Sequence, residues 1–309
     1  MTGRVRYRVV HETRYDYSAT VLGGHQLAHL EPRATPWQQV GAHRVDIDPV
    51  PRERWQGGDY FGNRVLRFVV DVPHDALTVR AESLVEVLGH APDRADLSPN
   101  WEAAAVAAEV GSPAVDVDLE QYRVASPMAP LLGQCADYAR LSFRPGRPWL
   151  DAAIDLTGRI RAEFAYDPKA TTVTTRVADV LKDRRGVCQD FAHLMISCLR
   201  SLGLPARYVS GYVLNRVAPG RQRLAGADAS HAWVAAHCPG LGWVAFDPTN
   251  GKLADLEFVT LGWGREFSDV TPLRGVVLGA ATQELTVAVS VQALEPQSAA
   301  GPPAERRLE

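Results

Sequence analysis

The chain has 309 residues, of which 46% are hydrophobic and 22% charged, and its formal net charge is −3. This composition is typical of a globular protein long enough to bury one large core or two smaller ones. Because the pI is about 6.3, the chain as a whole has no positive field that would attract nucleic acid or an anionic membrane surface. We therefore expect neither nucleic acid nor a membrane among its partners.

The N-terminal segment, residues 1–17, is charged throughout and lacks the apolar stretch of a secretory signal peptide. No segment reaches the roughly 20 consecutive apolar residues that cross a bilayer. We therefore expect a cytoplasmic location, where cysteines stay reduced. The four cysteines are too few and too scattered for a disulfide framework, and no Cys-x-x-Cys pair points to a zinc site. They are Cys135, Cys188, Cys198 and Cys238.

The first part of the chain alternates apolar and polar residues, which is the period of a half-buried β-strand. The strands expected from this pattern are Val5–Tyr17, Val45–Val50, Val65–Val72 and Leu77–Leu88. Proline, glycine and asparagine separate them, as is typical of turns. We predict an N-terminal antiparallel β-sandwich or barrel domain over residues 1–92.

A polar, proline-containing segment at residues 89–100 marks the expected domain boundary. Helical spacing of apolar residues follows, and later segments have the composition of strands. The expected helices are 101–110, 131–143, 150–164 and 187–203, and the expected strands are 205–214, 231–238, 243–246 and 285–291. We predict an α+β core over residues 100–294. The tail, residues 295–309, is rich in proline, alanine and charge, which is typical of a disordered segment.

Cys188 differs from the other cysteines because it follows Gly186 closely and begins an apolar helix. A thiol at a helix N-terminus faces unpaired backbone N–H groups and the positive end of the helix dipole, and both favour the thiolate. The same N–H groups can hold an oxyanion. Cys198 lies deep in that helix and fits a buried structural role, and Cys135 and Cys238 lack a glycine-then-helix context.

A thiolate nucleophile needs a base, and the base needs an acceptor that orients it. His231 begins one expected strand and Asp247 ends the next, so a short turn between antiparallel strands makes them neighbours. His237 lies on the same strand about 20 Å from His231, too far to serve the same thiol. We interpret His193 as structural, and we expect Asp190 to cap the helix or to bind a neighbouring group.

Four sequence blocks carry a family resemblance: RRGVCQDFAHL (184–194), GLPARYVSGYVL (203–214), DASHAWV (228–234) and GWVAFDPTNG (242–251). Together they resemble the core of bacterial transglutaminase-like proteins, which have a papain-related thiol fold with catalytic Cys, His and Asp in that chain order. The resemblance implies Cys188 as nucleophile, His231 as base and Asp247 as the residue that orients it.

Two other regions extend the resemblance. The β region, with Tyr15, Tyr17 and the segment 59–63, is similar to the N-terminal domain that accompanies this core. Residues 262–272 are similar to the family's C-terminal block, with Glu266 and Phe267 where the family pattern has Asp-Tyr. The implied fold is a papain-like or transglutaminase-like α+β core behind a β domain.

The implied reaction is attack on a carboxamide or peptide carbonyl, which gives a thioester that passes to water or to an amine. The expected partner is a protein or peptide substrate with a glutamine or other amide group. We favour hydrolysis, by a protease or amidase, because acyl transfer by a transglutaminase also requires a pocket that excludes water. The second oxyanion donor stays open between Tyr166 and Gln189, and the sequence does not indicate an oligomeric state.

The sequence also bears on two other classes of function. A non-catalytic protein-interaction module on the same scaffold is the alternative, and the complete set of Cys, His and Asp argues against it. A metal site formed by Cys188, His193 and Cys198 is excluded, because the two cysteines are about 15 Å apart along a helix. No cofactor is expected, since no glycine-rich phosphate-binding or dinucleotide-binding motif is present.

Overall fold

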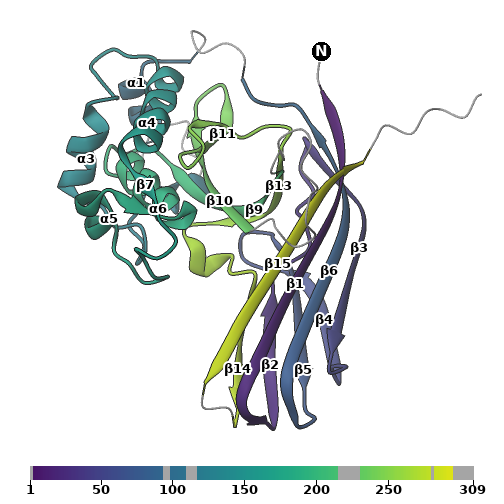
Figure 1. The fold of residues 1–309 in the computed structure, drawn as a ribbon. Helices are drawn as coiled ribbons and strands as arrows, with labels where there is room; N and C mark the ends of the chain where they lie inside the picture. Colours follow the sequence, from purple (N-terminus) through teal and green to yellow (C-terminus); the bar gives the residue numbers. More distant parts are fainter. Residues whose placement is uncertain (1–2, 93–97, 109–116, 215–229, 280–281, 295–309) are drawn as a thin grey trace, which may run out of the picture.

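The computed structural model describes residues 3–92, 98–108, 117–214, 230–279 and 282–294. Figure 1 shows a β domain of long strands beside a second domain, in which helices cover one side of a small curved sheet. No helix in the described ranges combines the length and the apolar composition needed to cross a membrane.

The β domain consists of two 4-stranded antiparallel sheets. The first sheet has the order β15-β1-β6-β3, formed by β15 (Gln283–Leu294), β1 (Arg4–Val21), β6 (His74–Leu88) and β3 (Gln38–Asp48). The second has the order β14-β2-β5-β4, formed by β14 (Leu273–Leu278), β2 (Gly23–Ala28), β5 (Arg64–Val70) and β4 (Glu53–Gly58). Apolar residues from both sheets, among them Ile47, Val79, Phe68 and Val70, form one buried cluster. The predicted antiparallel β-sandwich is therefore present.

Two strands of this sandwich come from the C-terminal end of the chain. β15 pairs along β1, with Tyr7 opposite Ala293, and β14 pairs with β2. The range predicted for the core, 100–294, thus includes two strands that lie in the sheets of the β domain. Alternation of apolar residues indicates that a segment is a strand, but it does not indicate which strand it pairs with. The tail 295–309 and residues 228–229 of the third sequence block lie outside the described residues.

The second domain packs helices against a 5-stranded antiparallel sheet with the order β12-β11-β10-β9-β13. Its strands are β9 (Ala206–Val213), β10 (Ser230–Cys238), β11 (Gly242–Asp247), β12 (Lys252–Leu253) and β13 (Phe258–Gly264). Its helices are α1 (Trp101–Ala107), α2 (Val117–Glu120), α3 (Gly133–Arg140), α4 (Trp149–Glu163), α5 (Val177–Asp183) and α6 (Cys188–Arg200), followed by the short 3-10 helix η2 (Phe267–Asp269). Two short parallel strands, β7 (Ala165–Tyr166) and β8 (Arg185–Gly186), complete it.

Helix α6 lies at the centre of this domain. Phe191, Leu194 and Leu199 of α6 share one buried cluster with Val234 of β10 and Phe246 of β11. Because the helix is enclosed by the sheet and by other helices, it needs apolar residues on every side rather than along one stripe. The continuous apolar pattern of residues 191–199 is explained by this position.

The two domains meet along β13, the edge strand of the curved sheet. The Gln38 side chain donates to the Thr260 carbonyl (2.7 Å) and accepts from the Thr260 N–H (2.8 Å). The Asn63 side chain does the same at Trp263, donating to its carbonyl (2.8 Å) and accepting from its N–H (3.0 Å). Two buried amide side chains therefore take the place of a neighbouring strand at this edge.

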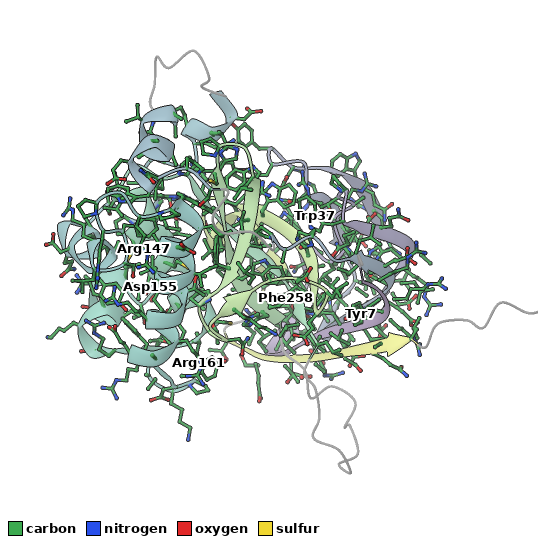
Figure 2. All side chains as sticks on the ribbon, turned by 90° about the horizontal axis from the view of Figure 1, so that it is seen from above. Tyr7, Trp37, Arg147, Asp155, Arg161 and Phe258 are labelled. Atoms are coloured by element: carbon green, nitrogen blue, oxygen red, sulfur yellow. The ribbon has the colours of Figure 1, made fainter. Side chains whose placement is uncertain are left out.

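Further contacts cross the same junction. The Tyr7 hydroxyl donates to the carbonyl of Leu256 at 2.8 Å. Figure 2 shows Tyr7 and Trp37 on the β-domain side of Phe258, with Arg147 and Asp155 among the helices beyond it. The curved sheet is thus held between the helices and the β-sandwich.

We predict that Asn63→Ala lowers the free energy of unfolding by about 2–4 kcal/mol, because it leaves two buried backbone groups of Trp263 without partners. Urea denaturation followed by circular dichroism measures this change. Gln39→Ala, which removes an exposed amide from β3, is the matched control, with an expected change within about 0.5 kcal/mol. Equal effects of the two substitutions would contradict the role given to Asn63.

Candidate active site

Cys188 is the first residue of α6, and its position is set by the residues around the helix start. Val187, in extended backbone conformation, is the N-cap. The Asp190 carboxylate accepts hydrogen bonds from the Val187 N–H (2.8 Å) and from the Thr171 hydroxyl (2.7 Å). Burial raises the pKa of Asp190, although these two hydrogen bonds oppose the shift. The expectation that Asp190 caps the helix or binds a neighbouring group is confirmed on both points.

Residue 186 must be a glycine because the Asp190 side chain lies directly against its backbone. A Cβ atom at residue 186 would lie 2.8 Å from Asp190 Oδ2 and 2.9 Å from Asp190 Cβ. Gly186 is buried and belongs to β8, which pairs with Tyr166 in β7. The absence of a side chain allows the capping carboxylate to lie directly against the backbone that leads to Cys188.

His231 and Asp247 lie together, as predicted from their places on consecutive strands. His231 Nε2 is 2.9 Å from Asp247 Oδ2. The register of β10 and β11 sets Val234 opposite Phe246, so Asp247 lies one residue further along, diagonally across from His231. The prediction of a hydrogen-bonded His231–Asp247 pair is confirmed.

The Asp247 carboxylate is completely buried, and the turn after β11 satisfies its remaining acceptor positions. Asp247 Oδ1 accepts from the N–H groups of Thr249 (2.9 Å) and Asn250 (3.2 Å), and the Asn250 side chain donates to Oδ2 at 2.5 Å. Burial raises the pKa of Asp247, but the hydrogen bond and charge of His231, together with the two bonds from Asn250, outweigh it and lower the pKa. The carboxylate is therefore held ionised and in one orientation.

The His231 imidazole lies between Asp247 and Cys188. Its side chain is 9% exposed, and burial by itself lowers its pKa. Hydrogen bonds to Asp247 and to Cys188, and the negative charges of both groups, outweigh burial and raise the pKa of His231 to about 10. Because Nε2 is bonded to Asp247, the other ring nitrogen is the one available to the thiol. Cys188 of α6, His231 of β10 and Asp247 of β11 thus form one hydrogen-bonded row of three side chains.

Two aromatic side chains and one amide lie near these three residues. Tyr166 and Tyr208 both have a raised pKa, caused first by burial and then by the negative charges of Cys188 and Asp190. Tyr166 is 56% exposed, whereas Tyr208 is buried. Gln189, a predicted oxyanion donor, gives its side-chain N–H to the Val173 carbonyl (3.3 Å). The sequence pattern does not distinguish Tyr208, since it is one tyrosine inside an apolar strand.

His193 and His237, the other two histidines of the second domain, have structural surroundings. His193 is buried, stacks on Tyr208 with ring centroids 5.0 Å apart, and accepts the Phe267 N–H at 3.2 Å. Burial, assisted by the charge of Arg200, lowers the pKa of His193 to about 3. His237 packs against Trp243 near the opposite end of β10 from His231.

The remaining cysteines are also buried. Cys198 lies in the centre of α6 and is hydrogen-bonded to Cys135 of α3. Burial raises the pKa of Cys238 to about 12. Within the described part of the chain, no group of three or more His, Cys, Asp or Glu side chains is arranged to hold a metal ion.

Comparisons with known proteins agree with this architecture. Residues 7–86 match the bacterial transglutaminase-like N-terminal region, and residues 137–248, which contain Cys188, His231 and Asp247, match the transglutaminase-like superfamily. A Mycobacterium tuberculosis protein described as uncharacterized is 40% identical over 286 residues, which cover 90% of this chain and 89% of that protein. The chain therefore belongs to the transglutaminase-like superfamily, a family of thiol enzymes.

Two further proteins are similar in part or in fold. The protein-glutamine gamma-glutamyltransferase of Pseudomonas aeruginosa is 40% identical over 89 residues, which cover 28% of this chain and 13% of that enzyme. A candidate cysteine protease of Cytophaga hutchinsonii has a solved structure that superimposes with a TM-score of 0.74 at 18% identity, covering 96% of this chain and 94% of that one. The second likeness shows the fold, and the predicted transglutaminase-like core with an N-terminal β domain is confirmed.

We predict that the free energy of unfolding decreases as pH rises from about 6.5 to about 10, the ordinary and the folded-state pKa of His231. A histidine whose pKa is raised by folding stabilises the protein fully below its unfolded pKa, and this contribution is lost as pH rises through the folded value. Urea denaturation at a series of pH values measures the slope. His231→Gln should remove this part of the slope, whereas His237→Gln should retain it. An unchanged slope in His231→Gln would contradict the assignment.

Proposed function

We propose that this protein is an enzyme in which the Cys188 thiolate attacks a carboxamide or peptide carbonyl. The observation that carries the proposal is the row of hydrogen bonds in which the His231 imidazole lies between Cys188 and the buried Asp247. The substrate is a protein or peptide that presents a glutamine side chain or another amide group. His231 acts as the base, and Asp247 orients its ring and stabilises the imidazolium.

The first half of the reaction forms a thioester. The Cys188 sulfur bonds to the carbonyl carbon, and the carbonyl oxygen becomes an oxyanion that accepts from the Cys188 N–H at the start of α6. When the tetrahedral intermediate collapses, the C–N bond breaks and His231 gives its proton to the departing amine or ammonia. The second oxyanion donor we favour is the Tyr166 hydroxyl, because the Gln189 side chain is directed to the Val173 carbonyl, to which it donates.

The second half releases the acyl group. With His231 again accepting a proton, water attacks the thioester carbon, the C–S bond breaks, and a carboxylic acid leaves. We favour this hydrolytic outcome because Tyr166, beside the thiol, is largely exposed, and hydrolysis does not require exclusion of water.

Acyl transfer to an amine is the second candidate. It is favoured by the local likeness to the Pseudomonas aeruginosa protein-glutamine gamma-glutamyltransferase. In that case a primary amine takes the place of water, loses its proton to His231, and ends in a new amide bond. The chemistry of the thioester is the same, and only the second nucleophile differs.

We predict that Cys188→Ala abolishes turnover of a blocked glutamine peptide, measured as release of ammonia, while the protein stays folded. His231→Ala should lower kcat/KM by about 10²–10⁴, the usual contribution of a general acid–base group. Asp247→Ala should leave more activity than His231→Ala, because the base itself remains. His237→Ala is the matched control and should retain full activity. Full activity in a folded Cys188→Ala protein would end the proposal.

Water and amine outcomes are separated by adding a primary amine such as cadaverine and analysing the peptide by mass spectrometry. Glutamate in place of glutamine indicates hydrolysis, and the amine adduct indicates acyl transfer.

Alkylation of Cys188 by iodoacetamide at about pH 6, where an ordinary thiol reacts slowly, tests the thiolate without any substrate. Loss of this fast reaction in His231→Ala supports the pair, and equal rates in the two proteins contradict it.

A further inference from the structure

A groove with a volume of about 880 Å³ lies in the β domain, on the outer face of the sheet β14-β2-β5-β4. Side chains alternate between the two faces of a strand. In this sheet Ala28, Phe68 and Val277 point into the sandwich core, so the intervening residues point outward. The outward residues of four strands therefore form one continuous surface.

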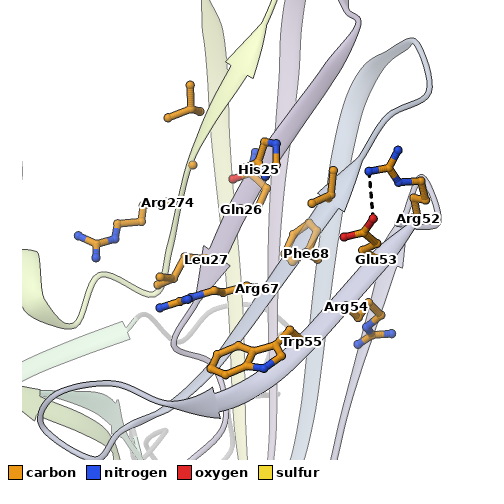
Figure 3. Close-up of a pocket in the computed structure, with 13 residues that line it drawn as sticks. His25, Gln26, Leu27, Arg52, Glu53, Arg54, Trp55, Arg67, Phe68 and Arg274 are labelled. Carbon is orange, nitrogen blue, oxygen red and sulfur yellow. Dashed lines mark ion pairs between the residues drawn. The ribbon is translucent and has the colours of Figure 1, made fainter.

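Strand register orders these residues into rows that cross the sheet. Arg274 pairs with Leu27, Leu27 with Arg67, and Arg67 with Trp55. These four residues, one from each strand, thus form a row perpendicular to the strands. Figure 3 shows their side chains following one another across the groove. The adjacent row is Val276, His25, Val69 and Glu53. We call these two rows the groove rows.

Trp55 is held in place as an exposed aromatic platform. Its indole lies directly on Gly57, where a Cβ atom would be only 2.0 Å from the ring. The Arg67 guanidinium lies 4.9 Å from the centre of the same ring, which is within the range of a cation–π contact. Trp55 nevertheless remains 49% exposed. A glycine and an arginine therefore fix the orientation of the ring, while about half of the Trp55 side chain stays exposed.

The two arginines of the first groove row have spare hydrogen-bonding capacity. Arg274 donates to the Ser268 carbonyl at 3.0 Å, and Arg67 contacts the ring of Trp55. Among the described residues, no carboxylate lies within ion-pair distance of either guanidinium. By contrast, Glu53 of the second row is paired with Arg52 at 3.0 Å. The charges in the groove rows that lack an ion-pair partner among the described residues, those of Arg67 and Arg274, are therefore positive.

We propose that the groove rows bind an acidic segment of a partner polypeptide in extended conformation. Arg67 and Arg274 lie two strands apart, about 10 Å between their backbones, and an extended chain places side chains on one face about every 7 Å. Alternate carboxylates of such a chain reach both long guanidinium side chains with charge-assisted hydrogen bonds. Leu27 lies between the two arginines, and Trp55 at the end of the row offers its ring to an apolar side chain of the partner.

Charge complementarity favours an acidic polypeptide over nucleic acid. A nucleic-acid surface has a continuous run of cations for successive phosphates and several aromatic rings for bases. The groove rows present two unpaired arginines, a single tryptophan, and several apolar residues between them. This mixture matches a chain in which acidic and apolar side chains alternate. The proposal concerns binding alone and does not depend on the thiol chemistry at Cys188.

The test is fluorescence anisotropy with a fluorescein-labelled peptide of about ten residues, long enough in extended form to cross all four strands. Glutamate occupies alternate positions, with phenylalanine and serine between them and no glutamine. We expect saturable binding that weakens as salt rises. The double variant Arg67→Gln/Arg274→Gln should bind about tenfold more weakly or worse, since it removes two charge-assisted contacts. Trp55→Ala should also weaken binding.

Arg44→Gln is the matched control, because it neutralises an exposed arginine of β3 in the opposite sheet, where Arg44 is paired with Asp46. It should leave the affinity unchanged, and thermal unfolding verifies that all variants fold. Arg274→Gln alone, which spares the Arg67–Trp55 contact, keeps the test informative if the double variant is unstable. Unchanged affinity in the folded variants, equal binding of a peptide with lysine in place of glutamate, tighter binding of a single-stranded oligonucleotide, or no binding would each overturn the proposal.

Discussion

The structure depends on the burial of helix α6, in which every residue from Asp190 to Arg200 is buried. Asp190, His193 and Arg200 have strongly polar side chains, and such a group left unpaired in the interior is strongly destabilising. Each of the three is bonded to another segment of the chain. Asp190 binds Thr171 and the residue before Cys188, His193 accepts from the Phe267 N–H, and Arg200 donates to carbonyls that include Ala206 and Arg265. The hydrogen bonds that these three side chains need thus fix the positions of segments around the candidate active site.

The same low-polarity surroundings explain the electrostatics of His231 and Asp247. Burial alone would keep the imidazole neutral and raise the pKa of the carboxyl group. The pKa values of both groups shift in the opposite directions, because the two side chains face each other and the turn at Thr249 and Asn250 supplies further donors to Asp247. Each charge is therefore acceptable only in the presence of the other, which is the arrangement that general acid–base catalysis at a thiol requires.

The β domain contributes to this site through the sheet that carries His231. β13 is an edge strand of that sheet, and Gln38 and Asn63, instead of another strand, bind backbone groups on its open side. β14 and β15 then return the chain to the sandwich and pair with β2 and β1. The sheet that carries His231 and the sandwich are consequently joined through these strands and contacts, while the groove rows lie on the outer face of the sandwich.

Several features of this protein were determined by local sequence alone. The apolar helix that begins at Cys188, the strands that carry His231 and Asp247, and the capping role of Asp190 all follow from hydrophobic spacing and from the chemistry of helix ends, and these depend on near neighbours in the chain. The family resemblance of four short blocks was sufficient to name the three residues of the candidate site.

Other features were decided only by tertiary structure. Local pattern could not show that β14 and β15 join the N-terminal sandwich, that Gly186 is needed for the approach of Asp190, or that Tyr208 lies near Cys188. It also could not align Arg274, Leu27, Arg67 and Trp55 in one row, because they come from four strands whose register is set by long-range pairing. A strand's own residues define its two faces, but its partners and register are chosen by the burial of side chains distant in sequence.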